Sequence, residues 1–326
     1  MSYLLKVSQL KKYFPVKKYV FGLIPKKKGD IKAVDNVSFE IKPGECFGLV
    51  GETGSGKTTT ARCIVLLEKP DSGKIEFEGQ NILSMSRKDL KKVKRNIQMI
   101  FQDPYTSLNP RIPIGKSIGE PLELHTDMSS QEIRSEVVTM LKEVGLSPLH
   151  YYRYPAEFSG GQRQRISIAR ALILKPKLIV ADEPVSSLDV SIKAKILNLM
   201  KLLQTKYNLS YLIISHEMSV IRFISHRIGV MYLGKIMEIA DKRSLFENPM
   251  HPYTKGLISS IPLPDPERKM KTAPLKGTLP SPINPPSGCR FRTRCEYAKE
   301  ICEKEVPQLI EVEDGHYVAC HLLQCS

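Results

Sequence analysis

One octapeptide, Gly51-Glu52-Thr53-Gly54-Ser55-Gly56-Lys57-Thr58, constrains the fold of this chain more than any other feature. Its two outer glycines, followed by lysine and threonine, match the pattern of a phosphate-binding loop. Such a loop must lie between a strand and a helix, and the apolar run 46–50 and the helical run 58–67 supply both. The sequence therefore predicts an α/β fold that binds a nucleoside triphosphate.

The parts of this loop have distinct chemical tasks. Glycines let successive backbone N–H groups converge on the β- and γ-phosphates, and the following helix adds its positive N-terminus. Lys57 supplies a point charge, and Thr58 is predicted to bind Mg²⁺. The predicted nucleotide contacts in and after the loop are Gly51, Gly54, Ser55, Gly56, Lys57, Thr58 and Thr59.

Two more apolar runs, 177–181 and 210–215, read as buried strands of a parallel sheet. Between the loop and these strands, Ser129 and Glu132 form a capping-box pattern. Apolar residues at helical spacing follow it up to Gly145, which predicts an amphipathic helix.

Two adjacent carboxylates, Asp182 and Glu183, follow the apolar strand that begins at Leu178. Downstream of a phosphate-binding loop they are suited to two tasks. Asp182 would meet Mg²⁺ through its hydration shell, and Glu183 would orient and deprotonate the attacking water. The alternative is a plain acidic strand end.

The hexapeptide Phe158-Ser159-Gly160-Gly161-Gln162-Arg163 resembles the signature motif of the ABC ATPases, with phenylalanine in place of the usual leucine. The resemblance implies a phosphate-loop ATPase core with an antiparallel β subdomain and a helical subdomain at about 104–161. It also implies ATP contacts from Ser159, Gly160, Gly161 and Gln162.

Further short motifs follow in the order of that family. The resemblance assigns the glutamine loop to Gln102, as a catalytic residue and Mg²⁺ ligand, the D-loop to Asp189, and the switch histidine to His216. Phe14 best matches the aromatic residue that stacks on adenine, with Tyr13 as the alternative. Family members work as dimers in which each ATP lies between the phosphate loop of one subunit and the signature of the other.

The segment His251-Pro252-Tyr253-Thr254 and the cysteine-bearing tail resemble the C-terminal extension of ATPases from dipeptide and oligopeptide permeases. The resemblance implies peptide import at the cytoplasmic face of the membrane by a peripheral ATPase. Its partners would be a second ATPase, two transmembrane permease subunits and an extracytoplasmic peptide-binding protein. The resemblance favours a heterodimer of the two ATPases over a homodimer. Nickel or another small solute is an alternative cargo.

Proline-rich stretches between Pro262 and Pro286 predict an extended linker. We expect a nucleotide-binding domain at 1–250 and a cysteine-rich extension at 251–326. Four thiols in that extension could close one site: Cys289, Cys295, Cys302 and Cys320. Their spacings fit no structural zinc pattern, which favours a [4Fe–4S] cluster over Zn²⁺.

Other arrangements of the tail stay open. Disulfides and unligated thiols are possible, although disulfides are disfavoured in the cytosol. His316 and His321 are alternative ligands, and Cys325 is the expected spare cysteine. Arg290, Arg292 and Arg294 could offset the negative charge of a thiolate-bound cluster.

The formal net charge of +15 favours anionic partners without identifying one. A soluble ABC ATPase acting on nucleic acid or ribosomes is therefore the main rival. About a hundred residues separate Lys57 from Ser159 without sustained heptads, which leaves no room for the long coiled coil of repair ATPases. No apolar run is long enough to span a bilayer, and we expect no nucleic-acid partner.

Overall fold

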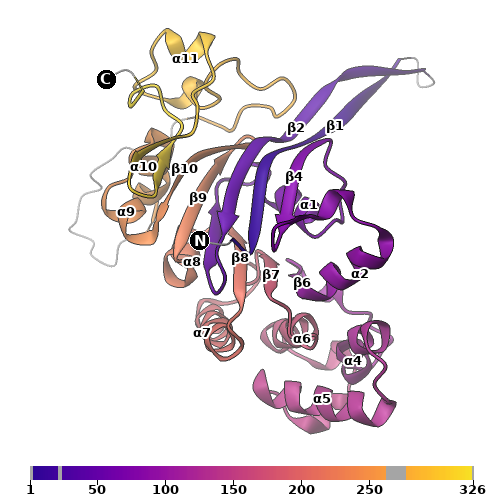
Figure 1. Ribbon diagram of the computed structural model, residues 1–326. Coiled ribbons are helices and arrows are strands. Elements are labelled where there is room, and N and C mark those ends of the chain that lie inside the picture. The colour runs from indigo at the N-terminus through magenta and orange to yellow at the C-terminus, as the bar shows by residue number, and fades with distance from the viewer. Residues whose placement is uncertain (1–2, 21–23, 262–276, 325–326) are drawn as a thin grey trace. The chain divides into compact units, whose positions relative to one another are not determined.

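The computed structural model describes residues 3–20, 24–261 and 277–324 (Figure 1). The chain forms two compact units, each built from separated segments. Unit 1 comprises Met1–Leu4, Ile41–Cys46 and Phe77–Ser215, and unit 2 comprises Leu5–Glu40, Phe47–Glu76 and His216–Ser326. The sequence-based division at residue 250 stays a prediction.

Unit 1 contains three parallel strands in the order β8, β7, β6. They span Ser210–Ser215, Leu178–Asp182 and Ile97–Ile100. Every residue of β7 and β8 is buried, as expected of parallel strands covered on both faces. The short β5 (Gln80–Asn81) and the 3₁₀ turn η1 (Ile82–Ser84) precede this sheet in the chain.

Helices make up the rest of unit 1. They are α2 (Arg87–Asn96), α3 (Pro104–Ser107), α4 (Ile114–His125), α5 (Ser130–Glu143), α6 (Gly160–Leu172) and α7 (Val190–Tyr207), with 3₁₀ turns η2 (Pro148–Tyr152) and η3 (Pro155–Glu157). The helix α4 packs on α5, α6 and η2, and α6 packs on β6 and α7. The predicted capping box is present, because Ser129 and Glu132 cap α5 reciprocally.

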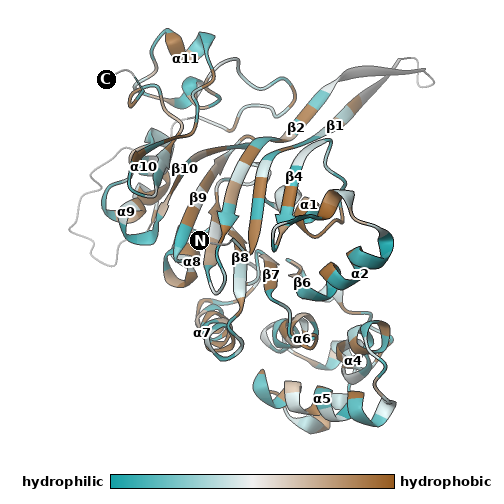
Figure 2. Ribbon diagram, viewed as in Figure 1, coloured by the Kyte–Doolittle hydropathy of each residue, from teal (hydrophilic) through white to brown (hydrophobic). Residues whose placement is uncertain are grey.

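Unit 2 contains two sheets. In one, β1 (Leu5–Val20) lies between β2 (Ile24–Ile41) and β4 (Ser72–Phe77). Along β1, buried Leu5, Val7 and Leu10 alternate with more exposed polar residues, a pattern visible in its colours (Figure 2). Taken from the sequence alone, the charged run Lys26-Lys27-Lys28 predicts a solvated loop; that prediction is wrong, because β2 includes these residues.

The other sheet of unit 2 has the order β11-β12-β10-β9-β3. Its strands are Ile310–Glu313, His316–Val318, Lys235–Asp241, Arg227–Tyr232 and Cys46–Val50. The strand β3 pairs in parallel with β9, whereas β9, β10, β12 and β11 pair antiparallel. The tail strands β11 and β12 therefore extend the sheet that carries the phosphate-binding loop.

The helices of unit 2 are α1 (Lys57–Ile64), α8 (Met218–Ile224), α9 (Lys242–Glu247), α10 (Pro252–Ser259) and α11 (Ile301–Lys304), with the 3₁₀ turn η4 (Arg292–Arg294). In chain order, α1 follows β3 and the glycine-rich loop, so the predicted strand, loop and helix are all present. Part of the proline-rich linker predicted from the sequence, including Pro262, Pro264 and Pro266, lies outside the described residues.

Candidate ATP site

Two glycines of the phosphate-binding loop are required by close backbone packing. A Cβ on Gly56 would lie 2.0 Å from the carbonyl oxygen of Ala33, and a Cβ on Gly51 would lie 2.0 Å from that of Met231. Gly56 also has a φ of 103°, which L side chains rarely adopt. The loop is therefore pressed against β2 and β9 at positions that only glycine can occupy.

The ammonium group of Lys57 lies inside the curve of this loop. It donates to the carbonyl oxygens of Gly51 (2.6 Å) and Glu52 (2.9 Å) and to Ser55 Oγ (3.2 Å), and Lys57 is 4% exposed. These contacts hold the positive charge beside the backbone N–H groups that open α1. Thr58 and Thr59 occupy the first turn of α1 and are half-buried.

The loop is also tied to the C-terminal part of the chain. The Arg294 guanidinium donates to both carboxylate oxygens of Glu52, at 2.6 and 3.1 Å. The backbone N–H of Glu52 donates to the hydroxyl of Tyr253 (3.0 Å). Neither contact is predictable from the local sequence, in which Arg294 stands among the tail cysteines and Tyr253 belongs to the motif His251-Pro252-Tyr253-Thr254.

The two aromatic candidates for adenine stacking differ in their surroundings. The Tyr13 hydroxyl donates to Asp35 (2.6 Å), and burial together with that carboxylate raises the pKa of Tyr13. Asp35 also pairs with Arg290 from the tail. Phe14 has no polar group to engage, and the Lys12 ammonium lies 5.1 Å from the centre of its ring.

In unit 1, the structure brings together two of the predicted catalytic residues. The side-chain amide of Gln102 donates to the Glu183 carboxylate over 3.0 Å. Asp182, at the end of β7, is 3% exposed. Glu183 has a φ of 45°, a conformation that costs a non-glycine residue about 1–2 kcal/mol, and its N–H is held by the carbonyl of Ile214 (2.9 Å). Such backbone strain is one reason to consider Glu183 for a functional role.

The signature residues open helix α6. Ser159 is its N-cap, and Ser159 and Gln162 bond reciprocally: Ser159 N–H donates to Gln162 Oε1 (3.0 Å) and Gln162 N–H to Ser159 Oγ (3.4 Å). Gly161 is buried, and a Cβ there would lie 2.6 Å from Ile192 of α7. The N-terminus of α6 is thus preorganised, with exposed Ser159 at its tip.

The remaining predicted residues, Asp189 and His216, each lie at a turn of the chain shortly before a helix. Asp189 is exposed and is the N-cap residue of α7 in unit 1. His216 is exposed in unit 2, two residues before α8 begins. Each of the two units thus carries part of the predicted ATP-binding set.

The four tail cysteines share one neighbourhood. Cys289, Cys302 and Cys320 are each 8% exposed, and the charge of each of the other three would act on Cys289. Burial, followed by these neighbours, raises the pKa of Cys289 to about 11. Each sulfur accepts a backbone N–H: from Phe291 for Cys289, from Tyr297 for Cys295, from Lys299 for Cys302 and from Leu322 for Cys320.

These thiols do not form a closed ligand set. Within residues 3–20, 24–261 and 277–324, no group of three or more His, Cys, Asp or Glu side chains could hold a metal ion as placed. The expected iron–sulfur site is therefore not found as a formed cluster in the described part of the chain. His316 Nε2 donates to the Glu238 carboxylate (2.7 Å) and His321 Nε2 donates to the carbonyl oxygen of Glu305 (3.0 Å), so both alternative ligands have other partners. Cys325 lies outside the described residues.

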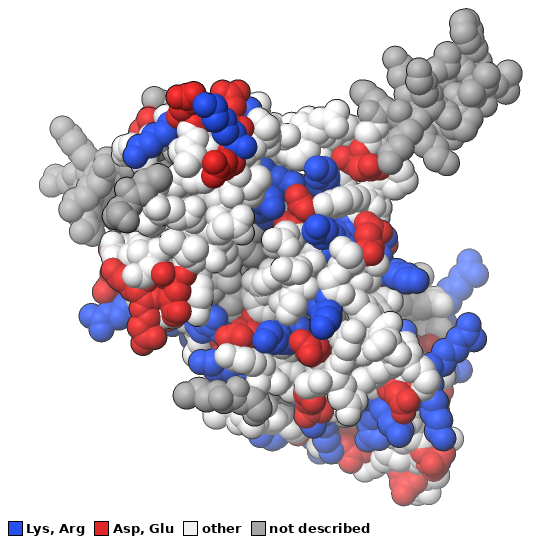
Figure 3. Space-filling model, turned by 45° about the horizontal axis from the view of Figure 1, so that its top comes forward, with Lys and Arg blue, Asp and Glu red and all other residues white. Residues whose placement is uncertain are grey.

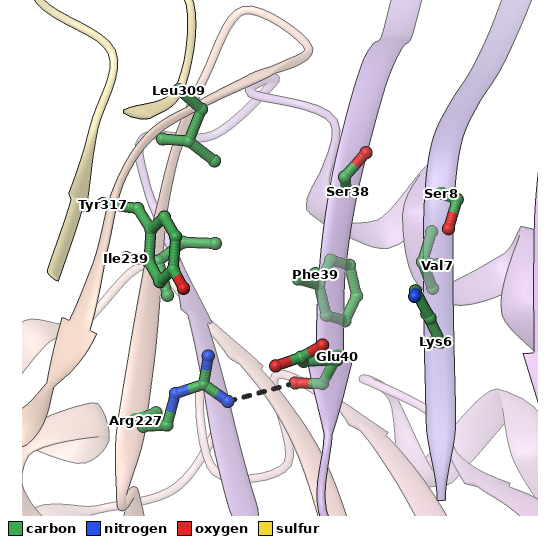
Figure 4. A pocket seen from close by; sticks show the side chains of 10 residues that line it. All are labelled: Lys6, Val7, Ser8, Ser38, Phe39, Glu40, Arg227, Ile239, Leu309 and Tyr317. Carbon is green, nitrogen blue, oxygen red and sulfur yellow. Dashed lines mark hydrogen bonds between the residues drawn. The ribbon is translucent and has the colours of Figure 1, made fainter. Parts of the chain in front are cut away.

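A separate pocket of about 280 Å³ lies in unit 2 (Figure 4). Its wall includes Phe39, Arg227 and Tyr317, and the Arg227 guanidinium donates to the carbonyl of Glu40 over 3.4 Å. None of its ten lining residues belongs to the predicted ATP site.

On the face shown in Figure 3, lysine and arginine side chains lie interspersed with aspartate and glutamate. Among the described residues, no helix is long and apolar enough to cross a membrane.

Comparison with known proteins identifies the family of the chain. The ABC transporter family model matches residues 34–186, and the model of the oligopeptide/dipeptide transporter C-terminal region matches residues 237–302. The chain is 52% identical over 322 residues to the oligopeptide transport ATP-binding protein AppF of Bacillus subtilis, covering 98% of this chain and 97% of that protein. It is 49% identical over 322 residues to OppF of Salmonella typhimurium, covering 97% and 95% of the two chains.

A solved structure shows the same fold. The dimeric ATP-binding cassette MJ0796, in a post-hydrolysis state bound to ADP and Pi, superposes with a TM-score of 0.64 at 29% identity, covering 73% of this chain and 99% of that one. The fold is that of an ABC ATPase cassette, an α/β phosphate-loop fold with an antiparallel β subdomain. The chain belongs to the ATP-binding subunits of the oligopeptide and dipeptide ABC transporter family, which hydrolyse ATP to drive peptide import.

Proposed function

We propose that this ATPase works as one half of a heterodimer, attached peripherally to the cytoplasmic face of the membrane. Its partners would be a second ATPase, two transmembrane permease subunits and an extracytoplasmic peptide-binding protein. Relatives with oligopeptide and di/tripeptide transport names support a peptide cargo. The dimeric cassettes among the similar structures support pairing of two ATPases.

Each ATP would lie between two chains. The phosphate loop of one chain, with Lys57 and the N–H groups of Gly54 to Thr59, would cradle the phosphates. The other chain would supply the N-terminus of α6, where Ser159, Gly160, Gly161 and Gln162 face the same phosphates, and Asp189 nearby. ATP then adds attractive contacts to the closed dimer, and hydrolysis removes them.

The single observation that carries the catalytic assignment is the 3.0 Å hydrogen bond from Gln102 to Glu183. It aims the carboxylate of Glu183, the general base that would take a proton from the attacking water. His216 would contact the γ-phosphate side of the site. Phe14 would stack on adenine, with Tyr13 as the alternative.

Magnesium is the cation that these oxygen donors fit. Thr58 offers a hydroxyl at the first turn of α1, Asp182 offers a carboxylate at the end of β7, and Gln102 offers an amide oxygen. Mg²⁺, when bound, neutralises charge on the β- and γ-phosphates. In the proposed site, the protein would contribute these oxygens from the ends of β6 and β7 and from the first turn of α1.

Co-purification tests the proposed assembly. The chain, solubilised in mild detergent from its native membrane, should bring down a second ATPase and multispanning subunits. The purified chain with Glu183→Gln should form ATP-dependent dimers with that second ATPase. Stable ATP-driven dimers of this chain alone, formed as readily as the mixed ones, would contradict the heterodimer.

We further propose that the tail holds a [4Fe–4S] cluster on Cys289, Cys295, Cys302 and Cys320. The support is the shared neighbourhood of the four thiols and the backbone N–H group that each sulfur accepts, since such hydrogen bonds stabilise cluster thiolates. The cluster would mainly staple a small lobe with little core of its own.

Metal analysis tests this part separately. Protein purified without oxygen should contain iron and acid-labile sulfide, and Cys302→Ser should lose both. Cys325→Ser, at the expected spare cysteine, is the matched control and should retain them. Stoichiometric zinc without iron would contradict the cluster.

A further inference from the structure

The phosphate-binding loop contains one acidic residue among its eight positions. Glu52 directly follows Gly51, and its carbonyl oxygen accepts from the Lys57 ammonium over 2.9 Å. A carboxylate so close to the phosphates would repel them, because like charges within a few ångströms disfavour one another. The loop needs something that cancels this charge.

The cancelling group comes from the tail. Arg294 reaches Glu52 across 242 positions of sequence and binds both carboxylate oxygens, a planar pairing that lysine cannot reproduce. The Arg294 side chain is 5% exposed, whereas that of Glu52 is 31% exposed. Arg294 is therefore held in place by the surrounding protein, and Glu52 is held in place mainly by Arg294.

An aromatic cluster fixes this arginine and the loop together. The rings of Tyr232, Tyr253 and Phe291 lie 4.7 to 5.4 Å apart between centroids, and the Arg294 guanidinium lies 5.9 Å from the centre of Tyr232. Burial alone would lower the pKa of Arg294, but its hydrogen bonds to the Glu52 carboxylate raise it. Tyr253 also holds the N–H of Glu52, so one cluster binds both the side chain and the backbone of that residue.

We propose that Arg294 is a positioning residue of the ATP site, which acts by holding the Glu52 carboxylate neutralised and turned away from the triphosphate. The tail is then part of the nucleotide site rather than a separate appendage. The inference rests on the proposed binding of ATP phosphates by this loop. It does not depend on the iron–sulfur cluster, because the contact needs only the described fold of the tail.

Nucleotide affinity of the full chain tests the proposal. Arg294→Gln leaves Glu52 unpaired and should weaken binding of a fluorescent ATP analogue with Mg²⁺ by about three- to tenfold, and ADP less, because ATP carries more charge. Glu52→Gln/Arg294→Gln should restore the affinity to within about twofold of the unaltered chain, since the repulsive charge is gone. A merely structural arginine would not be rescued by removing its partner.

The matched control is Arg243→Gln, which removes an exposed guanidinium that pairs with Glu247 over 2.9 Å on α9. It should leave both affinities unchanged. The proposal is overturned if Arg294→Gln binds ATP as the unaltered chain does, or if the double variant stays as weak as Arg294→Gln.

Two further comparisons cover a variant that does not fold and separate failure of the Arg294 role from failure of the proposed function. If Arg294→Gln does not fold, Glu52→Gln is compared with the double variant, and the two should bind ATP equally; a much weaker double variant would reject the proposal. Loss of ATP binding by the unaltered chain would instead refute the proposed function itself. Retained binding in that chain, with no effect of Arg294→Gln, refutes only the role of Arg294.

Discussion

The amide of Gln102 and the carboxylate of Glu183 lie 3.0 Å apart in unit 1, with the amide as donor. Gln102 follows β6 and Glu183 follows β7, and these strands pair in parallel. The carboxyl ends of neighbouring parallel strands therefore bring the proposed base and its hydrogen-bond donor to one edge of the sheet.

Glu183→Gln should retain ATP binding and lose at least about a hundredfold in turnover, because a positioned general base contributes that much or more. Steady-state phosphate release and nucleotide binding, measured on the same preparation with the partner ATPase, separate the two effects. Glu120→Gln, at an exposed carboxylate paired with Arg170, is the control and should hydrolyse ATP normally. Unchanged hydrolysis in Glu183→Gln would refute Glu183 as the base.

The signature serine can be tested with its capping role kept separate. Ser159→Ala removes the N-cap of α6, at a cost of about 1 kcal/mol in stability. Ser159→Asp retains a capping oxygen but places a negative charge where the partner's phosphates would dock. We expect Ser159→Asp to keep near-normal thermal stability and to lose ATP-driven dimerisation, as followed by size-exclusion chromatography. Dimerisation at the normal ATP concentration would show that Ser159 does not face phosphate.

Gly56→Ala should destabilise the protein and abolish ATP binding. Its Cβ would collide with the Ala33 carbonyl, so the cost exceeds the roughly 1–2 kcal/mol of a left-handed φ alone. Gly79→Ala isolates that backbone term: its φ is 79°, and no atom of the described residues lies within 4 Å of the added Cβ. Denaturant unfolding compares the two, and equal losses would mean that the loop is not tightly packed there.

Acid should destabilise unit 2 through His251. Burial lowers the pKa of His251 from its ordinary 6.5 to about 4 in the folded protein. Between these values the unfolded chain binds a proton that the folded chain does not, so the free energy of unfolding falls as pH drops from 6.5 to about 4. The total loss is about 3 kcal/mol.

A capping substitution provides the control for this titration. His251 Nδ1 accepts the N–H of Tyr253 at the start of α10, and Asn in its place retains a capping acceptor but no titration. Glu238 and Lys255 act on His251 by charge and remain in both proteins. The pH dependence of unfolding should be flatter for His251→Asn in this window; parallel curves would exclude His251 as the cause.

Local signals were enough to predict the central elements of this fold. The strand Cys46–Val50, the strand Ser210–Ser215 and the capped helix that begins at Ser130 are present, because apolar runs and caps act over a few residues. The run Lys26-Lys27-Lys28 is predicted to be a loop because consecutive charged residues lack the alternating pattern of a half-buried strand. These residues nevertheless belong to β2, which pairs with β1 through the backbone.

Contacts between distant segments could not be predicted in this way. Nothing near Glu52 in the sequence indicates that its charge is paired by Arg294, and nothing near Asp35 indicates Arg290. Each acidic residue is separated from its partner by more than two hundred positions, and a periodic pattern carries no information at that range. The assignments of Glu183, Ser159 and His216 to catalysis and phosphate binding stay predictions that the variants above can decide.

The separation of Arg294 from Glu52 along the chain also has a consequence during protein synthesis. During synthesis the glycine loop emerges from the ribosome long before Arg294 exists, so the nascent chain carries an uncompensated acid beside its phosphate-binding groups. The chain can supply the countercharge only after Arg294 has been synthesised. If Arg294 acts as proposed, a polypeptide that ends before it would therefore bind ATP more weakly than the full-length chain.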